Sequence, residues 1–267
     1  MFFFLGGFLL IIGIVLFFAQ KDQKKKAFSL KVAETFTISD LHRTSQEIAQ
    51  EIGPGNWREY VKVRGKVKCD EPLTSPLAEK NCVYYSMSVS REYEETVTNT
   101  DEDGNTTRET ERNSETLSSD DQSIPFTLRD STGAIAIDPS DADIETVSVL
   151  DEFRPQAAPG GMLSFGRFSL TLGEEQLSGN RRTLGYRYSE DILPLDRDLF
   201  VLAMASDGEG SLRLQKPTEH DRKFLLSLKS EDELIANAES SAKTSFTWML
   251  VCLIGGVALI LLGLVTS

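Results

Sequence analysis

Two long apolar segments enclose a middle region in which polar and apolar residues alternate. Residues 2–19 (FFFLGGFLLIIGIVLFFA) and 246–265 (FTWMLVCLIGGVALILLGLV) contain no charged residue. A helix rises about 1.5 Å per residue, so each segment is close to the length that covers about 30 Å of hydrocarbon. The pattern therefore predicts a transmembrane helix at each end.

A cleaved signal peptide is the main alternative for the first segment. No basic residue precedes Phe2, and Phe17 and Ala19 do not form a small-x-small cleavage site, so a retained helix is favoured. Lys21 and the run 24–26 follow the helix, and lysines beside a span favour the cytoplasmic side. We expect a cytoplasmic middle region and two termini on the opposite side.

The middle region predicts one β-rich α+β domain over residues 27–229. Residues 39–52 have helical apolar spacing, with Ser39 or Asp40 as N-cap and a Gly-Pro-Gly stop. Residues 57–68 and 83–89 alternate like strands, and Gly65 fits a bulge or a close approach between backbones.

Turn signals divide the rest of the middle region. Residues 91–123 fit a long solvated hairpin better than a disordered insertion, and residues 124–137 fit a hairpin around an Asp-Ser-Thr-Gly turn. Residues 155–166 are expected to form a loop, followed by strands within 185–206 and 211–217. Short antiparallel strands of this kind suggest an OB-like barrel with a long hairpin.

A last helix is expected to lead into the second apolar segment. Ser230 and Glu233 have the spacing of a capping box, which predicts a juxtamembrane helix over residues 230–243. This helix would continue into the transmembrane helix 246–265.

Charge and cysteine content exclude several classes of function. The formal net charge is −13, which argues against nucleic acid and other polyanions as partners. Cys69, Cys82 and Cys252 are too few for a disulfide scaffold, and the first two would be reduced in the cytoplasm. A Cys69–Cys82 bridge stays open if the domain lies on the other side.

The sequence offers no catalytic, cofactor-binding or metal-binding motif. His42, His220, Cys69 and Cys82 lack the spacing of a zinc site, and no nucleophile elbow or phosphate loop occurs. Acidic runs at 101–103 (Asp101, Glu102, Asp103) and 120–121 (Asp120, Asp121) are more typical of solvated loops than of calcium sites. We therefore expect no catalytic residue, no metal, no cofactor and no small-molecule substrate.

Three motifs in a fixed order resemble a known family: VKVRGKVKCDEPLTSPLAEKNCVYY, IPFTLRDSTGAIAIDP and LFVLAMASDGEGSLRLQKP, followed by a helix into a terminal span. Together they resemble the GIDE, or beside-a-membrane (BAM), domain of mitochondrial-anchored RING-type E3 ubiquitin ligases and their prokaryotic and plant relatives. The residues that carry the resemblance are Gly65, Pro76, Cys82, Tyr84, Tyr85, Pro125, Phe126, Asp130 and Gly133.

The resemblance implies a membrane-anchored module related to ubiquitin transfer and to organelle organization. In such ligases a RING with eight Cys or His ligands performs catalysis, whereas this sequence has three cysteines and two histidines. No residue of this sequence can therefore be assigned the role of a RING ligase residue. We expect a protein-interaction or membrane-sensing module. Its partners would be the lipid bilayer and other membrane proteins.

Two alternatives stay open at this point. Transferase activity could be completed by a partner RING protein, or the domain could be purely architectural with residues 91–123 as a spacer. The resemblance also implies that the domain lies in the intermembrane space or the periplasm, whereas the lysines predict the cytoplasm.

Overall fold

A computed structural model describes residues 2–100, 106–155, 161–173, 181–208, 210–219 and 222–266. The chain divides into two compact units, which we call the barrel unit (1–65, 128–143 and 198–267) and the sheet unit (66–127 and 144–197). The sequence pattern pointed to one continuous domain over residues 27–229. Both units are rich in strands, and the barrel unit also carries the helices, so the predicted β-rich α+β class is confirmed.

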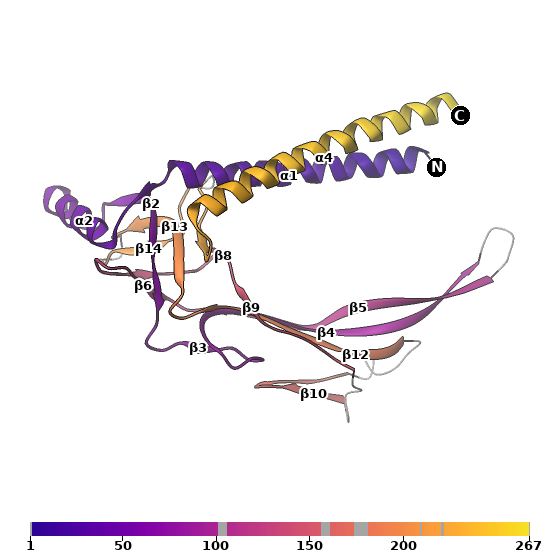
Figure 1. Cartoon of the computed structure of the whole chain (residues 1–267), viewed down its shortest axis with the longest axis horizontal. Helices are drawn as coiled ribbons and strands as arrows, with labels where there is room; N and C mark the ends of the chain where they lie inside the picture. Colours follow the sequence, from indigo (N-terminus) through magenta and orange to yellow (C-terminus); the bar gives the residue numbers. More distant parts are fainter. Residues whose placement is uncertain are drawn as a thin grey trace. The chain divides into compact units, whose positions relative to one another are not determined.

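The barrel unit contains the helices and most of the short strands (Figure 1). Its elements are α1 (Phe2–Val32), β1 (Glu34–Thr35), α2 (Ile38–Ile52), β2 (Arg58–Lys68), β6 (Phe126–Arg129), β7 (Ala134–Ile137), β8 (Asp143–Ile144), β13 (Asp198–Ser206), β14 (Arg213–Gln215), β15 (Leu225–Ser227) and α4 (Glu231–Thr266).

Five strands of the barrel unit form a closed ring. The sheet runs β2, β6, β7, β14, β13, and β13 also pairs with β2, which closes the ring. The β7–β14 pair is parallel, with Leu214 opposite Ile137, whereas β13 and β14 are antiparallel. The OB fold is a five-stranded barrel, so this ring is consistent with the OB-like barrel suggested by the sequence.

Helix α2 is attached to the barrel by the turn between β6 and β7. The N-cap is Thr37, whose side chain accepts from the Asp40 N–H. The Asp130 carboxylate accepts from the Ile38 N–H at 2.9 Å, and the Thr132 hydroxyl accepts from the Ser39 N–H at 3.0 Å. The predicted caps, Ser39 and Asp40, are therefore wrong, because the turn supplies acceptors that the local sequence does not reveal.

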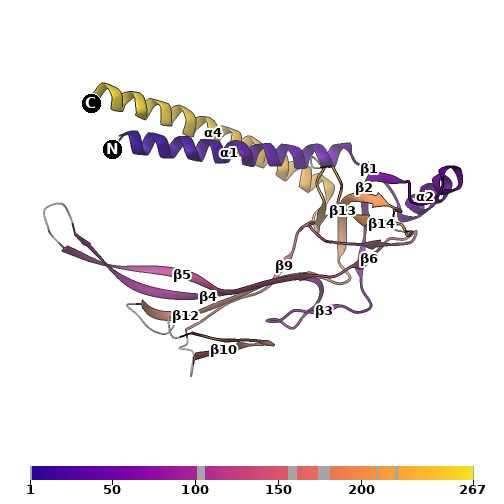
Figure 2. The same ribbon diagram turned by 180° about the vertical axis from the view of Figure 1, so that it is seen from behind.

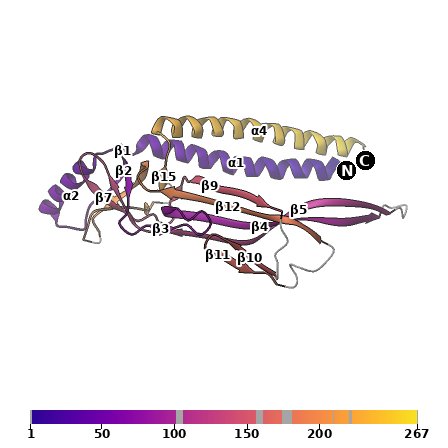
Figure 3. The same ribbon diagram turned by 60° about the horizontal axis from the view of Figure 1, so that its bottom comes forward.

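The sheet unit contains β3 (Leu73–Thr74), β4 (Asn81–Thr100), β5 (Thr106–Ser123), β9 (Val147–Arg154), β10 (Met162–Phe165), β11 (Phe168–Thr171) and β12 (Arg181–Pro194). Strands β5, β4, β12 and β9 lie side by side and antiparallel (Figure 3). The long β4–β5 hairpin confirms the hairpin expected at 91–123, although residues 101–105 lie outside the described residues.

A second hairpin covers one face of this sheet. Strands β10 and β11 pair with each other, and Leu163 packs with Tyr186 and Tyr188 of β12 in the core of the unit. The loop expected at 155–166 is wrong for residues 162–165, and residues 156–160 lie outside the described residues. Glycines and prolines around this short strand hid its alternation.

Candidate functional site

The residues with metal-ligand chemistry do not gather in the described part of the chain. His42 Nε2 lies 3.0 Å from the Ala134 carbonyl oxygen, and Cys69, Cys82 and Cys252 are free thiols. Among the described residues no three His, Cys, Asp or Glu side chains lie close enough to hold a metal ion. His220 lies outside the described residues.

Of the two acidic runs, the one at 120–121 likewise forms no such cluster among the described residues. Asp120 accepts a hydrogen bond of 2.7 Å from the Tyr85 hydroxyl, so this carboxylate helps to fix the β4–β5 pairing. Burial, followed by that hydrogen bond, raises the pKa of Tyr85 to about 12. Asp121 is exposed. Asp101, Glu102 and Asp103 lie outside the described residues.

The most distinctive feature of the barrel unit is the pair formed by α1 and α4. The two helices lie side by side and run in opposite directions, so the two ends of the chain meet at one end of the pair (Figures 1 and 2). Glycines allow a close approach. A Cβ atom on Gly6 would lie 2.9 Å from the Gly256 carbonyl oxygen, and one on Gly13 would lie 2.9 Å from Leu253 Cδ2.

The register of the pair aligns the two apolar segments. Gly6 lies opposite Gly256, Gly13 opposite Leu253, and Gln20 lines the same groove as Phe246. Residues 2–19 therefore lie alongside 246–265 over their whole length. Both helices are long and apolar enough to cross a membrane, and most of their apolar surface is exposed.

Polar residues begin at the same level on both helices. On α1 the apolar stretch ends at Ala19 and is followed by Gln20, and on α4 it begins at Phe246. Trp248 is 58% exposed close to this level, as is typical of aromatic side chains at a membrane interface. The helix pair thus has an apolar part and a polar part with one shared boundary.

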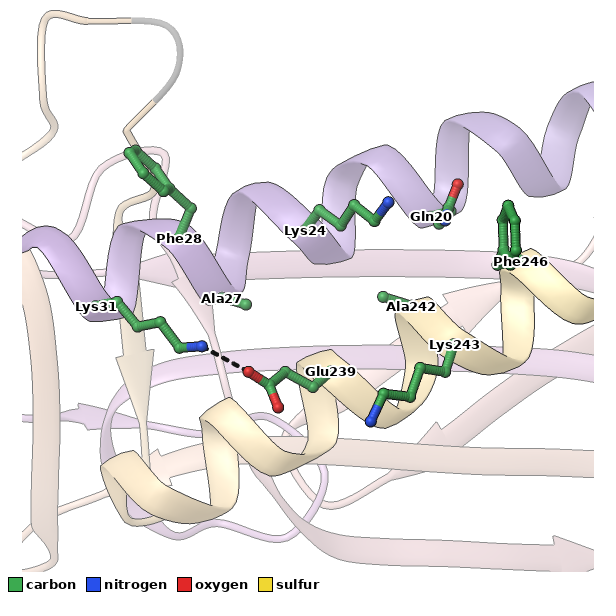
Figure 4. Close-up of a pocket in the computed structure, with 9 residues that line it drawn as sticks. All are labelled: Gln20, Lys24, Ala27, Phe28, Lys31, Glu239, Ala242, Lys243 and Phe246. Atoms are coloured by element: carbon green, nitrogen blue, oxygen red, sulfur yellow. Dashed lines mark hydrogen bonds and ion pairs between the residues drawn. The ribbon is translucent and has the colours of Figure 1, made fainter.

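A groove lies between the helices just on the polar side of this boundary (Figure 4). Its volume is about 460 Å³. It is lined by Gln20, Lys24, Ala27, Phe28, Lys31, Glu239, Ala242, Lys243 and Phe246. Lys31 Nζ lies 2.6 Å from Glu239 Oε1, and this bond, together with the charge of Lys31, lowers the pKa of Glu239.

The polar part of the helix pair is packed on the outside of the barrel. Leu30 of α1 and Leu234 of α4 are buried against Phe200 and Leu202 of β13. Lys62 of β2 also forms an ion pair of 2.6 Å with Glu231, the first residue of α4. Apolar burial and this ion pair fix both helices to the barrel.

The start of α4 matches its expected capping box. The Glu233 carboxylate accepts from the Ser230 N–H at 2.8 Å, and the Ser230 hydroxyl accepts from the Glu233 N–H at 3.2 Å. The expected juxtamembrane helix and the second apolar segment form one continuous helix, α4.

Three of the residues that carry the family resemblance, Gly65, Asp130 and Gly133, lie in the barrel unit and stabilise its packing. A Cβ on Gly65 would lie 2.7 Å from the Arg129 carbonyl oxygen, which confirms the close approach expected there. Asp130 accepts from Thr132 and Gly133 N–H groups at 2.6 and 2.9 Å in addition to capping α2. Burial would raise the pKa of Asp130, but the hydrogen bonds from Ile38, Thr132 and Gly133 outweigh it and lower this pKa.

The sheet unit contains a buried carboxylate that the sequence did not reveal. Glu190 of β12 is fully buried and accepts from Ser75 Oγ at 2.6 Å and from the Leu77 and Ala78 N–H groups at 2.7 Å each. The turn containing Pro76 is held in this way over the buried Cys82. Burial, followed by the charge of Glu190, raises the pKa of Cys82 to about 11.

Fold and site together define a class of protein: an OB-like barrel carried by two antiparallel helices that can cross a membrane. A family model described as GIDE, E3 ubiquitin ligase, matches residues 94–262, which is more than half of the chain. The chain belongs to the GIDE family. No curated protein and no solved structure matches it.

The family match confirms the resemblance and limits its extent. Pro125, Phe126, Asp130 and Gly133 lie within the matched range, whereas the family-like residues from Gly65 to Tyr85 precede it. Sequence reasoning identified both apolar helices but not the groove, because the groove forms only when residues more than 200 positions apart pair in one register.

Proposed function

We propose that this chain is a two-pass membrane protein that holds its β-rich domain beside the bilayer as a non-enzymatic module for protein interaction or membrane sensing. The observation that carries the proposal is the register of α1 and α4, which aligns both apolar segments and both polar boundaries. Two unrelated surface helices would have no reason to share that boundary.

The arrangement suits interactions within the plane of a membrane. Two anchors packed on one barrel confine the domain to a thin layer, which raises its effective concentration for other membrane proteins. The sheet unit offers an edge for such a partner, because β5 pairs only with β4 among the described strands. Open main-chain groups along an edge strand can accept a strand from another chain.

We further propose that the domain lies in the cytoplasm. Lys21 and the lysines at 24–26 follow the first apolar segment, and Lys243 precedes the second, so the basic residues flank the same polar boundary. The ligases that the sequence resembles imply the opposite side, and the topology experiment distinguishes the two.

Membrane association is tested on the full-length chain in native membranes. Extraction at alkaline pH should leave it in the pellet, and detergent should release it. Tags at the two ends should be protected from protease on one side while a tag between Thr100 and Thr106 is cleaved on the other. Release by alkaline extraction, or end tags on opposite sides, would contradict the two-pass topology.

The interaction role is tested by crosslinking in native membranes followed by quantitative proteomics. The wild type should enrich a reproducible membrane partner. A variant with proline in place of alternate residues of β5 should lose that partner, while Glu109→Gln, which changes one exposed side chain of β5, should keep it. Equal recovery with all three proteins would exclude the β5 edge as the contact.

A transferase activity completed by a partner RING protein is the alternative, and the family description favours it. Among the described residues there is no cluster that could hold zinc, so the metal and the bound conjugating enzyme would come from the partner. This alternative predicts that a zinc-binding protein copurifies and that ubiquitin transfer depends on both chains. Purified chain that transfers ubiquitin alone, or copurification without any RING protein, would count against it.

A further inference from the structure

The groove between α1 and α4 combines three lysines with an apolar floor. Lys24, Lys31 and Lys243 line it together with one carboxylate, Glu239, which leaves two excess positive charges in a chain whose formal net charge is −13. The floor consists of the buried Ala27 and Ala242.

The two lysines nearest the boundary are available to a ligand. Glu239 is bonded to Lys31 at 2.6 Å. Within the described part of the chain, the ammonium groups of Lys24 and Lys243 have no carboxylate within 4 Å, and both side chains are exposed. The charge of Lys243 still acts on Glu239 and contributes to the lowered pKa of that carboxyl. Figure 4 shows that they come from opposite helices.

Their depth corresponds to that of lipid headgroups. Lys24 lies four residues beyond Gln20, about 6 Å along the helix axis, and Lys243 lies three residues before Phe246, about 4–5 Å. The headgroup layer on each side of the hydrocarbon is about 5–8 Å thick. The Lys31–Glu239 pair lies farther from the boundary and closes the polar end of the groove.

The opposite end of the groove opens toward the apolar helix surface. Phe246 is 44% exposed at the boundary, and Leu250, one turn further along the same face of α4, is 40% exposed. A ligand that fills the groove would thus have charge to satisfy at one end and apolar surface to cover at the other.

We propose that this groove binds one anionic phospholipid, with its headgroup at the lysine end of the groove, where the long side chains of Lys24 and Lys243 can turn toward it, and its acyl chains along Phe246 and Leu250. Basic pockets between membrane helices are suited to anionic headgroups. A zwitterionic lipid such as phosphatidylcholine is disfavoured because it brings its own cation to the lysines. The proposal rests on the proposed function, since a bilayer lipid reaches the groove only if the helices enter the membrane.

The test uses full-length protein in an uncharged detergent, titrated with phosphatidylglycerol or phosphatidylcholine and followed by native mass spectrometry. The wild type should retain one phosphatidylglycerol at least about tenfold more tightly than phosphatidylcholine. K24Q/K243Q should lose about tenfold or more of that affinity, because each lysine near a headgroup contributes appreciably. Glu239→Gln should bind about threefold more tightly, because it releases Lys31.

The matched control is K21Q/K25Q, which removes the same amount of charge close to the boundary, on α1 alone, without changing a residue of the groove lining. It should retain phosphatidylglycerol within about threefold of the wild type. If both double variants lost the same affinity for phosphatidylglycerol, the lipid would be held by general electrostatic attraction to lysines and not by the groove. That result would overturn the proposal. Competition by glycerol phosphate as strong as that by the lipid would also overturn it, since the groove would then bind a soluble anion.

Alkaline extraction separates this proposal from the membrane topology. A chain that stays in the membrane but retains no phosphatidylglycerol would refute the lipid site alone. A chain that alkaline extraction releases would refute the membrane topology instead.

Discussion

Gly6 and Gly256 face each other where α1 and α4 approach closely, and a Cβ on either residue would lie 2.9–3.0 Å from the carbonyl oxygen of the other. Such a contact leaves no room for a side chain. Small residues at helix interfaces allow this close packing in membranes.

The first prediction concerns this contact. Gly6→Leu should separate the helices and lower the stability of the helix pair by about 1–3 kcal/mol, the usual range for overpacking. Gly7→Leu is the matched control, because a Cβ on Gly7 would meet nothing within 4 Å. Thermal unfolding in detergent should show a loss for the first variant only, and equal melting temperatures would refute the close approach.

The second prediction tests the register of the helices by a covalent link. A Cβ on Gly13 would lie 3.8 Å from Cys252 Cβ, which is within the range of a disulfide. Gly13→Cys should therefore form a disulfide with Cys252 under mild oxidation. After cleavage of the chain between the helices, the two fragments should stay together until reductant is added.

Two controls accompany this link. Gly13→Cys combined with Cys252→Ser should give no linked fragments. Gly7→Cys, on an open face of α1, should not link to Cys252 either. Linked fragments in the Gly7→Cys variant would mean that the helices rotate or slide past one another.

The third prediction concerns thiol reactivity. Cys82 is fully buried and its pKa is raised to about 11, so at pH 8 only about one thiol in a thousand is ionised. A membrane-impermeant maleimide should modify the half-buried Cys69 in the folded protein and Cys82 only after unfolding. Mass spectrometry of the labelled peptides measures both, and native labelling of Cys82 ahead of Cys69 would contradict the packing.

The fourth prediction concerns the buried Glu190. Glu190→Ala would leave the Leu77 and Ala78 N–H groups without their acceptor, at a cost of about 1–3 kcal/mol for the buried Leu77 group and less for the half-buried Ala78 group. Chemical denaturation should detect the loss, and Cys82 should react faster with maleimide. Glu109→Gln, on the exposed side of β5, should leave both measurements unchanged.

The fifth prediction concerns acid stability. The pKa of Asp130 is lowered in the folded protein, so its hydrogen bonds stabilise the fold above the ordinary pKa near 3.8 and are lost as the pH falls below it. Asp130→Asn should thus be less stable than the wild type at neutral pH. The difference should shrink as the pH is lowered from 4 toward 2, and a constant difference would contradict the role of the charge.

Local sequence patterns predicted the helices and strands well, but they did not predict the contacts between elements that are distant in sequence. The apolar segments, helix α2 and the Ser230–Glu233 capping box follow from residues that are neighbours in sequence, so each was predictable. The N-cap of α2 was placed wrongly because Asp130 and Thr132, which hold its first turn, are about 90 residues away.

The net charge of the chain likewise could not predict the basic groove. The formal net charge of −13, from which we expect no polyanionic partner, describes only the chain as a whole. The groove instead collects Lys24 and Lys243 from opposite ends of the sequence. A count of charged residues within any local stretch of the sequence therefore could not have revealed this pair of lysines.

The division of the barrel strands along the chain has a consequence for biosynthesis. The ring joins β2, which precedes both segments of the sheet unit, to β13 and β14, which follow them, so ring closure must wait until residue 215 has left the ribosome. Pairings that span so many residues form slowly. The first apolar helix is therefore complete long before the barrel against which it packs can close.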